Sequence, residues 1–526
     1  MKRSGLFLTL FVATFGAACS GGGSSTLPPP PPLGFSNSSL KGQYAFTMSG
    51  QAPDGFIARI GTFVADGNGG IAAGGVEVVS TFSGGFQLLN FNASTYQVNS
   101  DGRGAINLTN ITGTISFSIT MTATSGGYIC ETDGVTGTSG TFQLQDTSAF
   151  TLNGINGPFV FDTSGLDPNG VPDSIVGQFT LNSGTVQQGG VFDENDGAVA
   201  SGPTTISANS YFLDATNGAT NGLGQLSFNG FVYDFIIVNS KKIFMIEVPG
   251  QTALAGTTTI GTANGQVAAP ANNPAFHGNF AYLIAGVGTN SSNEKAGRFT
   301  TDGAGNLSGI ALDDKQLGSS ITQIPSGTLS AASYTIDQNF PGSGRGTLTF
   351  KDSSKGTFSL IFYMSSATQG VIQDNSANLV GDGVIMAQTG SPFTNSSIAG
   401  DYAFNWNGVS TNTTNGVSAE EDFVGHVTLS SAASNNVTGA MDFSELNSNQ
   451  GAFHDSALTG SLTINGDGTN SSGARSGVTI TAAGTSGPST TFKFTVYVVN
   501  STTIFVVSQD TDRVTGGTFT KQVTPP

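Results

Sequence analysis

The sequence predicts an all-β protein built from four tandem antiparallel modules. Three observations predict it: a pattern that recurs four times, apolar residues that alternate with polar ones, and turns rich in glycine. The composition agrees, because 75 Gly and 38 Phe among 526 residues supply turns and apolar material for several cores. Charged residues make up only 10% of the chain, whereas disordered chains are rich in charge.

The first residues predict export. Two basic residues precede a short apolar run over 6–15, and small residues then lead to Cys19. This run is shorter than the roughly 20 apolar residues that a membrane-spanning helix needs. A glycine- and serine-rich stretch and a proline run at 28–32 follow as a tether. The whole resembles a bacterial lipoprotein signal, which implies acylation of Cys19. Cleavage after Ala18, which would release a soluble secreted protein, is the alternative.

One pattern recurs in domain-sized steps. Each copy opens with Gly-x-aromatic-x-aromatic, and the opening glycines are 115, 121 and 122 residues apart: Gly42, Gly157, Gly278 and Gly400. A second glycine follows after 19, 20, 19 and 25 residues, at Gly61, Gly177, Gly297 and Gly425. Steps of this size exceed a solenoid turn and suit modules that fold one by one. The expected boundaries are a signal peptide at 1–19, a tether at 20–39 and β repeats at 40–150, 151–268, 269–391 and 392–526.

Alternation with a period of two predicts the strands within a repeat. Over 115–121 the apolar residues fall on one face and hydroxyl side chains on the other, and 492–499 repeats this. Turns such as Asp101-Gly102 separate these stretches. We count about eight strands in a repeat, which suits a small up-and-down barrel of the lipocalin or avidin type. Barrel closure removes exposed sheet edges, so the barrel is favoured over an immunoglobulin-like sandwich.

The signal, the tether and the repeated Gly-x-Tyr-x-Phe and Gly-x-Phe-x-x-Asp-Gly motifs together resemble the tandem-repeat bacterial lipoproteins of the acidobacterial type. The resemblance covers nearly the whole chain. The fourth repeat departs most, because it lacks the Asp-Gly turn after Gly425 and carries longer inserts. The resemblance implies a lipoprotein of the outer membrane or cell surface. It implies no chemistry, since that family has no assigned activity.

Charge and cysteine content exclude some functions. The net charge of −17 disfavours nucleic acid as a partner, because phosphate binding needs clustered cations. Once Cys19 is acylated, Cys130 has no partner for an intramolecular disulfide, and we expect it to be a buried small apolar residue in a strand. The three histidines have neither metal-ligand nor triad spacing.

Carboxylates after the second landmark of each repeat are the candidates for chemistry: Glu77, Asp193, Glu194, Asp313, Asp314, Asp442 and Glu445. Their loose placement favours exposed hairpin acids that hydrogen-bond their own turn. A hydrolase would need two carboxyls held in one cleft. Its first candidates are Asp193 with Glu194 and Asp313 with Asp314.

Two oxygen-rich loops in the second repeat are candidates for a structural calcium ion, since hard cations bind several such oxygens around a tight turn. The candidate ligands are Asp167, Asn169, Asp173, Asp193, Asn195 and Asp196. Neither loop has the closing Glu of the common calcium-binding loop. No other cofactor is expected.

We therefore expect an exported, lipid-anchored repeat protein of the cell envelope with a non-enzymatic binding, adhesion or structural role. Its expected partners are the membrane, through the N-terminal anchor, and a polysaccharide, cell-wall or surface-protein ligand. Two alternatives stay open: an extracellular hydrolase with paired carboxylates, and a carrier of a small apolar ligand inside the barrels. The Phe content favours filled barrels over hollow ones.

Overall fold

The computed structural model describes residues 34–525 with gaps at 54, 83–84, 249–257, 289–290, 325–328, 354–355, 377–378, 412–417, 435, 447–451, 467–477 and 484–489. The predicted signal peptide, Cys19 and the proline run lie outside the described residues. No helix in the described part of the chain is long and apolar enough to cross a bilayer.

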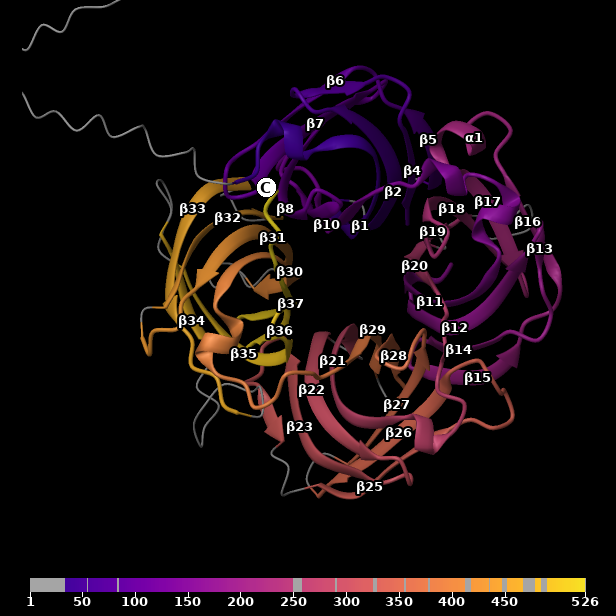
Figure 1. Cartoon of the computed structure of the whole chain (residues 1–526), viewed down its shortest axis with the longest axis vertical. Coiled ribbons are helices and arrows are strands. Elements are labelled where there is room, and N and C mark those ends of the chain that lie inside the picture. The colour runs from indigo at the N-terminus through magenta and orange to yellow at the C-terminus, as the bar shows by residue number, and fades with distance from the viewer. Residues whose placement is uncertain are drawn as a thin grey trace, which may run out of the picture. The chain divides into compact units, whose positions relative to one another are not determined.

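Strands make up almost all of the regular structure and form four sheets, which we call modules 1 to 4 (Figure 1). Module 1 contains the 3-10 helix η1 (Asn37–Ser39) and β1 (Lys41–Ala52), β2 (Gly55–Asp66), β3 (Gly70–Ala72), β4 (Val76–Thr81), β5 (Gly85–Asn90), β6 (Ser94–Val98), β7 (Arg103–Asn110), β8 (Gly113–Ala123), β9 (Gly126–Glu131) and β10 (Gly137–Leu144). Module 2 contains η2 (Thr147–Ala149), η3 (Leu152–Ile155), β11 (Gly157–Leu166), β12 (Pro172–Asn182), β13 (Thr185–Val186), β14 (Val191–Asp196), β15 (Val199–Thr205), β16 (Asn209–Leu213), α1 (Gly218–Asn221), β17 (Leu223–Phe228), β18 (Phe231–Asn239), β19 (Lys242–Glu247) and β20 (Thr258–Gly265).

The last two modules follow the same order. Module 3 contains η4 (Asn273–Ala275), β21 (His277–Gly288), β22 (Ser291–Asp302), β23 (Leu307–Gln316), β24 (Thr322–Ile324), β25 (Leu329–Ile336), β26 (Arg345–Asp352), β27 (Gly356–Met364), β28 (Gln369–Asp374) and β29 (Leu379–Ala387). Module 4 contains η5 (Asn395–Ile398), β30 (Gly400–Thr411), β31 (Ser418–Leu429), β32 (Val437–Glu445), β33 (Ala452–Ser461), β34 (Val478–Ala483), β35 (Thr490–Asn500), β36 (Thr503–Ser508) and β37 (Arg513–Lys521).

The strand pairing confirms the predicted barrel over the sandwich. In module 4 the strands β30 to β37 pair in chain order and close, as an up-and-down barrel does. Modules 1 and 2 close through β1 with β2 and β11 with β12, and each adds a hairpin, β4–β5 or β14–β15, to that second strand. Module 3 is a nine-stranded sheet whose ends meet at an isolated bridge between Asn306 and Ser333, so its closure is less complete.

The two glycines that mark each repeat have separate physical reasons. Gly42, the second residue of β1, has a φ of 122°, a value that strains any residue with a side chain. The second glycine pairs with the second aromatic residue of the opening motif. In module 1 a Cβ on Gly61 would lie 2.2 Å from the ring of its strand partner Phe46. Equivalent contacts of 2.7, 2.5 and 2.4 Å occur at Gly177, Gly297 and Gly425. The aromatic ring occupies the space that a side chain would take at the glycine. Because the two residues pair across one hairpin, the length of that hairpin sets the number of residues between the two landmarks.

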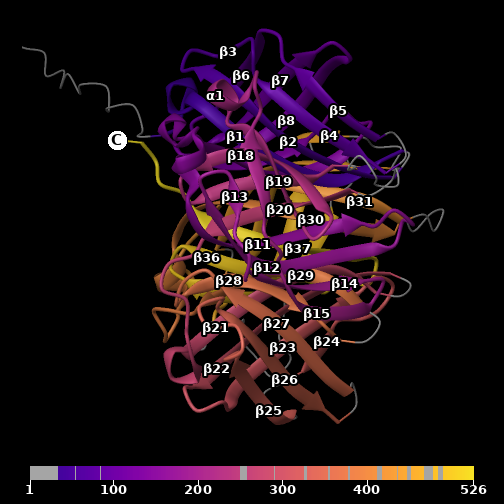
Figure 2. The ribbon, with the colours of Figure 1, turned by 90° about the vertical axis from the view of Figure 1, so that its right-hand side faces the viewer.

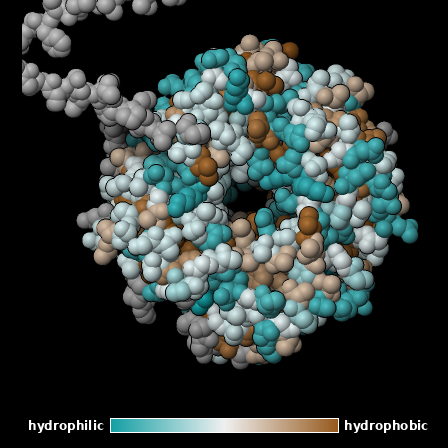
Figure 3. Space-filling model, viewed as in Figure 1, coloured by the Kyte–Doolittle hydropathy of each residue, from teal (hydrophilic) through white to brown (hydrophobic). Residues whose placement is uncertain are grey.

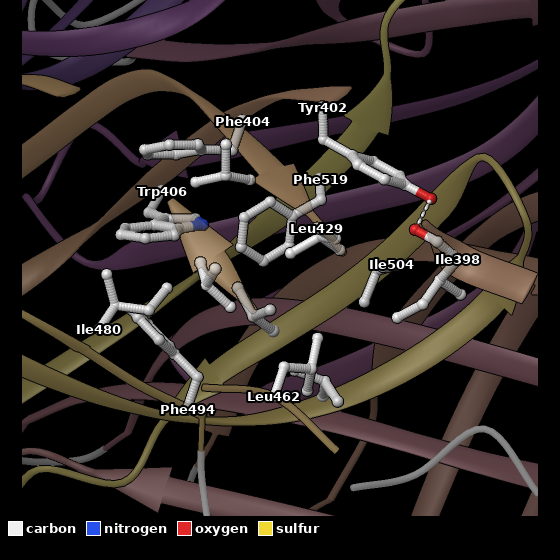
Figure 4. Packing of buried hydrophobic residues seen from close by; sticks show 14 of the residues in the cluster. Ile398, Tyr402, Phe404, Trp406, Leu429, Leu462, Ile480, Phe494, Ile504 and Phe519 are labelled. Carbon is white, nitrogen blue, oxygen red and sulfur yellow. Dashed lines mark hydrogen bonds between the residues drawn. The ribbon is translucent and has the colours of Figure 1, made fainter. Parts of the chain in front are cut away.

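Each barrel interior is filled by its own side chains. In module 4 Trp406 stacks on Phe404 with ring centroids 4.1 Å apart and lies 4.6 Å from Phe494 (Figure 4). Buried aromatic and aliphatic clusters fill the other three modules as well. Phe117 and Ile119 on β8 point inward with the predicted alternation. Burial of these rings stabilises each module from within.

A short 3-10 helix ahead of the first strand covers one end of each barrel. An apolar residue in the helix or directly after it joins the core in every module: Leu40, Ile155, Phe276 and Ile398. In module 2 the Tyr211 hydroxyl donates to the Leu152 carbonyl in this helix at 2.6 Å. Tyr96 and Tyr334 make the corresponding contact in modules 1 and 3, and Tyr402 of the first strand does so in module 4. We call this the plugged end of a barrel and the opposite end the far end.

Neighbouring modules pack through the outer faces of their sheets, as with β11 and β12 against β28 and β29 (Figure 2). Apolar clusters join module 1 to 2, module 2 to 3, and module 3 to 4. Among the described residues no apolar cluster joins module 4 to module 1, and polar contacts lie at this junction. There the Tyr128 hydroxyl lies 2.7 Å from Thr520 Oγ1, and the buried Cys130 thiol lies 3.6 Å from the Asp422 carbonyl. Cys130 is thus buried in a strand, as predicted.

One glutamine per module ties each of these four junctions. Gln145 follows the last strand of module 1, and its Nε2 donates to two backbone carbonyls of module 2 at 3.2 and 2.5 Å. Gln266 donates to two backbone carbonyls of module 3, and Gln388 donates to the Val498 carbonyl of module 4. Gln522, after the last strand of module 4, donates to two carbonyls of module 1 at 2.9 and 2.8 Å. The junctions therefore form a closed cycle with one repeated contact.

Candidate binding site at the far ends of the barrels

The acids expected to be exposed in hairpins are mostly buried, so that prediction is wrong. Glu77, Asp193, Asp313 and Asp442 are between 0% and 6% exposed. Asp193 shows the reason, because its carboxylate accepts hydrogen bonds from Arg345 Nε and Nη2 at 2.7 and 2.8 Å. The Tyr363 hydroxyl donates to the same carboxylate at 2.6 Å. Both partners belong to module 3, and the junction of modules 2 and 3 covers the outer face of β14.

The carboxylate pairs predicted for a hydrolase are not pairs in space. Neighbouring residues on a strand point to opposite faces of the sheet. Asp193 faces module 3, whereas Glu194 lies on the face of β14 that carries core residue Phe192. Asp313 accepts a hydrogen bond from a tyrosine of module 4, while Asp314 accepts one from within module 3. The hydrolase alternative therefore loses the residues that were predicted to serve it.

The residues predicted to bind calcium are divided among separate settings. Asp167 accepts N–H groups of its own turn, including that of Asn169 at 2.9 Å. Asp193 and Asn195 face module 3, where Asn195 Nδ2 donates to two backbone carbonyls at 2.9 and 2.8 Å. The other two candidates point into the barrel and are described below. Among the described residues, no set of three or more His, Cys, Asp or Glu is arranged to hold a metal ion. The calcium ion stays a prediction.

A buried ion pair occupies the far end of module 1. Arg59 Nη1 lies 2.8 Å from Glu77, and Nη2 lies 3.5 Å from Glu131. Thr138 donates to the second oxygen of Glu131 at 2.8 Å. All three charged side chains lie on inward faces of their strands and are no more than 9% exposed. A cation from the chain itself thus balances the buried acids.

Modules 3 and 4 have the same feature. In module 3 Lys295 forms a buried ion pair with Asp374, and in module 4 Arg513 Nη1 lies 3.1 Å from Glu421. Each cation also lies over a phenylalanine ring of its core, at 5.6 and 4.6 Å from the ring centroid. Three of the four barrels therefore carry their own basic side chain at the far end.

In its described residues, module 2 has the acids without the cation. Asp173 on β12, Glu194 and Asp196 on β14, and Glu247 on β19 lie on the strand faces that carry core residues. Asp173 is the strand partner of Asp196, and Glu247 is the strand partner of Tyr233, whose ring belongs to the core. Among the described residues, none of these four acids forms an ion pair with a Lys or Arg, and the charges that act on them most strongly are those of other carboxylates. We call the four residues the acidic end of module 2.

Burial and mutual repulsion raise the pKa values of these acids. Burial raises the pKa of Asp173 to about 8, and the neighbouring carboxylates Glu194, Glu247 and Asp196 add to the shift. Burial likewise raises the pKa of Glu247 to about 7. Asp173 is 5% exposed, and its Oδ1 has no hydrogen-bond partner in the described part of the chain. An unbalanced group of carboxyls in a partly dry place attracts a positive charge.

A second candidate site lies where module 4 meets module 1. A cavity of about 340 Å³ there is lined by Arg103, Ser118, Asp442 and His454, among others. Ser118 Oγ lies 3.4 Å from His454 Nδ1, and Asp442 Oδ1 lies 4.0 Å from the same nitrogen. A hydrolytic triad needs the serine and the acid on different ring nitrogens. Arg103 Nη1, 3.6 Å from Asp442, also competes for the acid, so the three residues do not form a triad.

Sequence reasoning missed the cations at the far ends, although a signal for them exists. Arg59 and Lys295 each stand two residues before the second landmark glycine, at the same position of their repeats. Ile175 and Phe423 occupy that position in modules 2 and 4. A comparison of this position across the repeats shows a basic residue in modules 1 and 3 and an apolar residue in module 2.

No family model matches the chain, and no curated protein matches it. Among solved structures, a DUF3598-family protein of unknown function from Nostoc punctiforme is 12% identical with a TM-score of 0.16, over 48% of this chain and 98% of that one. Transferrin binding protein B from serogroup B Neisseria meningitidis is 10% identical with a TM-score of 0.20, over 76% and 84%. A mutant of transferrin binding protein B from Haemophilus parasuis is 9% identical with a TM-score of 0.19, over 75% and 81%. At these TM-scores the likeness carries no argument about the present chain.

Proposed function

We propose that the chain is an exported, lipid-anchored cell-surface scaffold with a non-enzymatic binding role. The observation that carries this proposal is the filling of all four barrels by their own aromatic and aliphatic side chains. A ligand would then bind at the outer faces and ends of the barrels, as it does in an adhesion or capture protein. This leaves the carrier of a small apolar ligand without support, because that role needs an interior free of side chains.

The closed cycle of junctions supports a scaffold role. Most of the acids that were candidates for chemistry are committed to structural contacts, as Asp193 is to Arg345. The face of the molecule in Figure 3 is largely polar, with apolar residues scattered over it, as suits contact with a hydrated polysaccharide or protein surface. Four linked modules also present several surfaces at once, which raises effective concentration for a repeated ligand.

Binding tests this function directly. The full chain, immobilised on beads, is incubated with isolated cell walls, a polysaccharide panel and surface-protein extracts. Retention above that of an inert protein of matched net charge supports the proposal, and no retention on any of them contradicts it. Hydrolysis of a glycan or ester in the same samples would favour the hydrolase instead.

Anchoring has its own test. Cells that express the chain incorporate labelled palmitate into it, and Cys19→Ser removes the label. Cys130→Ser is the matched control and keeps the label, because Cys130 is buried in β9. Label that survives Cys19→Ser would contradict a lipid anchor at that residue.

A further inference from the structure

Among the residues that the structure describes, three modules supply a cation to the acids at their far ends, and module 2 does not. Glu131, Glu247 and Asp374 occupy corresponding inward positions on β9, β19 and β28, each two residues after an inward apolar residue. In modules 1 and 3 this acid faces Arg59 and Lys295 respectively. The position of those cations is taken by Ile175 in module 2. Module 2 therefore has the acid but an apolar residue at the position of the base.

One of the remaining acids, Asp173, has a carboxyl oxygen without a donor among the described residues. Oδ1 of Asp173 is buried and has no hydrogen-bond partner among the described residues. Thr259 donates to Glu247 at 2.7 Å and Ser201 lies 3.5 Å from Glu194, so the neutral donors present serve the other acids. In modules 1, 3 and 4 the corresponding need is met by an N–H donor that carries a positive charge.

Part of the acidic end of module 2 faces solvent. Asp196 is exposed and Glu194 is half-buried, whereas Asp173 and Glu247 are buried behind them. A cation that enters past Asp196 meets carboxyl oxygens on β12, β14 and β19. Tyr233 on β18 and Thr259 on β20 complete the lining, since both lie on the inward faces of their strands.

We propose that the acidic end of module 2 binds an alkylammonium or guanidinium group from outside the chain. The group takes the place that Arg59, Lys295 and Arg513 take in the other modules, and its N–H donors satisfy Asp173. A metal ion fits less well, because no described set of three acidic, His or Cys residues is arranged to hold one. The cation comes from a free amine or from a Lys or Arg side chain of a partner. The partner source rests on the proposed binding function.

The charge of the site sets the pH dependence of binding. The titratable groups that face Asp173 come from three other strands, and they are Glu194, Asp196, Glu247 and Tyr233. Asp167, in the turn before β12, faces Asp196. Burial raises the pKa values of Asp173 and Glu247 to about 8 and about 7, so both carry protons at pH 5. A cation must displace these protons, and binding therefore strengthens from pH 5 to pH 8.

Isothermal titration calorimetry of the full chain tests the proposal. The probes n-butylammonium and methylguanidinium chloride represent a free small cation. The tripeptide Gly-Arg-Gly with blocked, uncharged termini represents a partner side chain. Tetramethylammonium chloride is the control cation, because it has the charge but no N–H donor. We expect at least one of the three probes to bind at one site per chain, and to bind more weakly at pH 5 than at pH 8. Tetramethylammonium should not bind. Preference for the tripeptide over methylguanidinium identifies a partner side chain as the source.

Three variants locate the site. Ile175→Lys supplies the missing cation at the position of Lys295, and we expect it to abolish binding. Asp173→Asn removes the buried charge without changing the volume, and we expect binding weakened about tenfold or more. Asp214→Asn is the matched control at the plugged end of the same module, where the carboxylate accepts backbone N–H groups of its turn. It should bind as the parent does.

Several results would overturn the proposal. They are binding of calcium chloride but no N–H cation, equal binding of tetramethylammonium, and unchanged binding in Asp173→Asn. Near-ultraviolet circular dichroism checks that Ile175→Lys is folded; if it is not, Asp173→Asn decides the question. Retention of the parent on cell walls, with no amine binding, would refute this site and leave the scaffold function intact.

Discussion

Arg59→Met removes the cation that Glu77 and Glu131 share at the far end of module 1. Methionine keeps most of the apolar length of the side chain, so the change is chiefly one of charge. Glu77 and Glu131 are both 0% exposed and lose their basic partner together. Removing one partner of a buried pair costs about 3 to 5 kcal/mol, and we expect a loss of unfolding free energy in this range at pH 8.

The sign of the pH effect follows from the acids. An acid whose pKa is higher in the folded state than in the unfolded state holds a proton that unfolding releases, so stability falls as pH rises between the two values. Burial already raises the pKa of Glu131 to about 8 in the parent, and losing Arg59 removes an opposing charge. At pH 5 the Glu131 carboxyl is protonated in the variant, so the loss caused by its unpaired charge disappears and the expected loss is smaller, about 1 to 3 kcal/mol for the lost hydrogen bonds.

Urea unfolding of the full chain, followed by far-ultraviolet circular dichroism, measures both values. Lys41→Met, an exposed residue of β1, is the charge-matched control and should stay within about 0.5 kcal/mol of the parent. Arg59→Met with Glu77→Leu, which replaces the charged pair by apolar side chains, should recover most of the loss at pH 8. An equal loss at pH 5 and pH 8, or a double variant no better than the single one, would refute the reasoning.

Four further predictions concern the core, the junction and the plug. Trp406, the one tryptophan of the sequence, is fully buried, so its emission should be blue-shifted and resist iodide quenching until module 4 unfolds; quenching in the native state would contradict this core. In a Cys19→Ser background, burial raises the pKa of the Cys130 thiol, which should react with a thiol reagent at pH 8 only after denaturant is added. Fast native labelling would show that the junction opens. Gly425→Ala brings a Cβ within 2.4 Å of a core ring and should lower the free energy of unfolding in urea by about 1 to 3 kcal/mol. Tyr211→Phe loses one hydrogen bond to the plug and should lower the same free energy by about 1 kcal/mol. A parental urea midpoint for Gly425→Ala would contradict the packing described for the landmark glycine.

The sequence predicts the parts of this fold that depend on local pattern. Alternation places Phe117 and Ile119 inward, and the paired glycine and aromatic landmarks reflect a contact across one hairpin. The fate of Asp193 could not be read locally, because its partners Arg345 and Tyr363 are more than 150 residues away. Periodicity assigns a residue to the outer face of a sheet but does not say whether another module covers that face.

The candidate site could be predicted only in part. Asp173 and Asp196 were singled out for their oxygen atoms, and both do point into module 2. Glu247 was missed, because it lies far along the chain on β19 and becomes a neighbour only when the barrel closes. The absence of a basic residue at Ile175 is informative only beside Arg59 and Lys295, that is, after the repeats are placed in register.

The closed cycle of four junctions also has a consequence for the order of the modules along the chain. Phe35, near the start of the described chain, and Gln522, near its end, both approach Gly102, where a Cβ would lie 2.9 and 2.6 Å from them. A short peptide could therefore join these two points without moving either module. New termini could then be opened in the connection between any two modules. A circularly permuted chain that begins with module 3 should rebuild every junction, so which module comes first is a matter of history and not of folding.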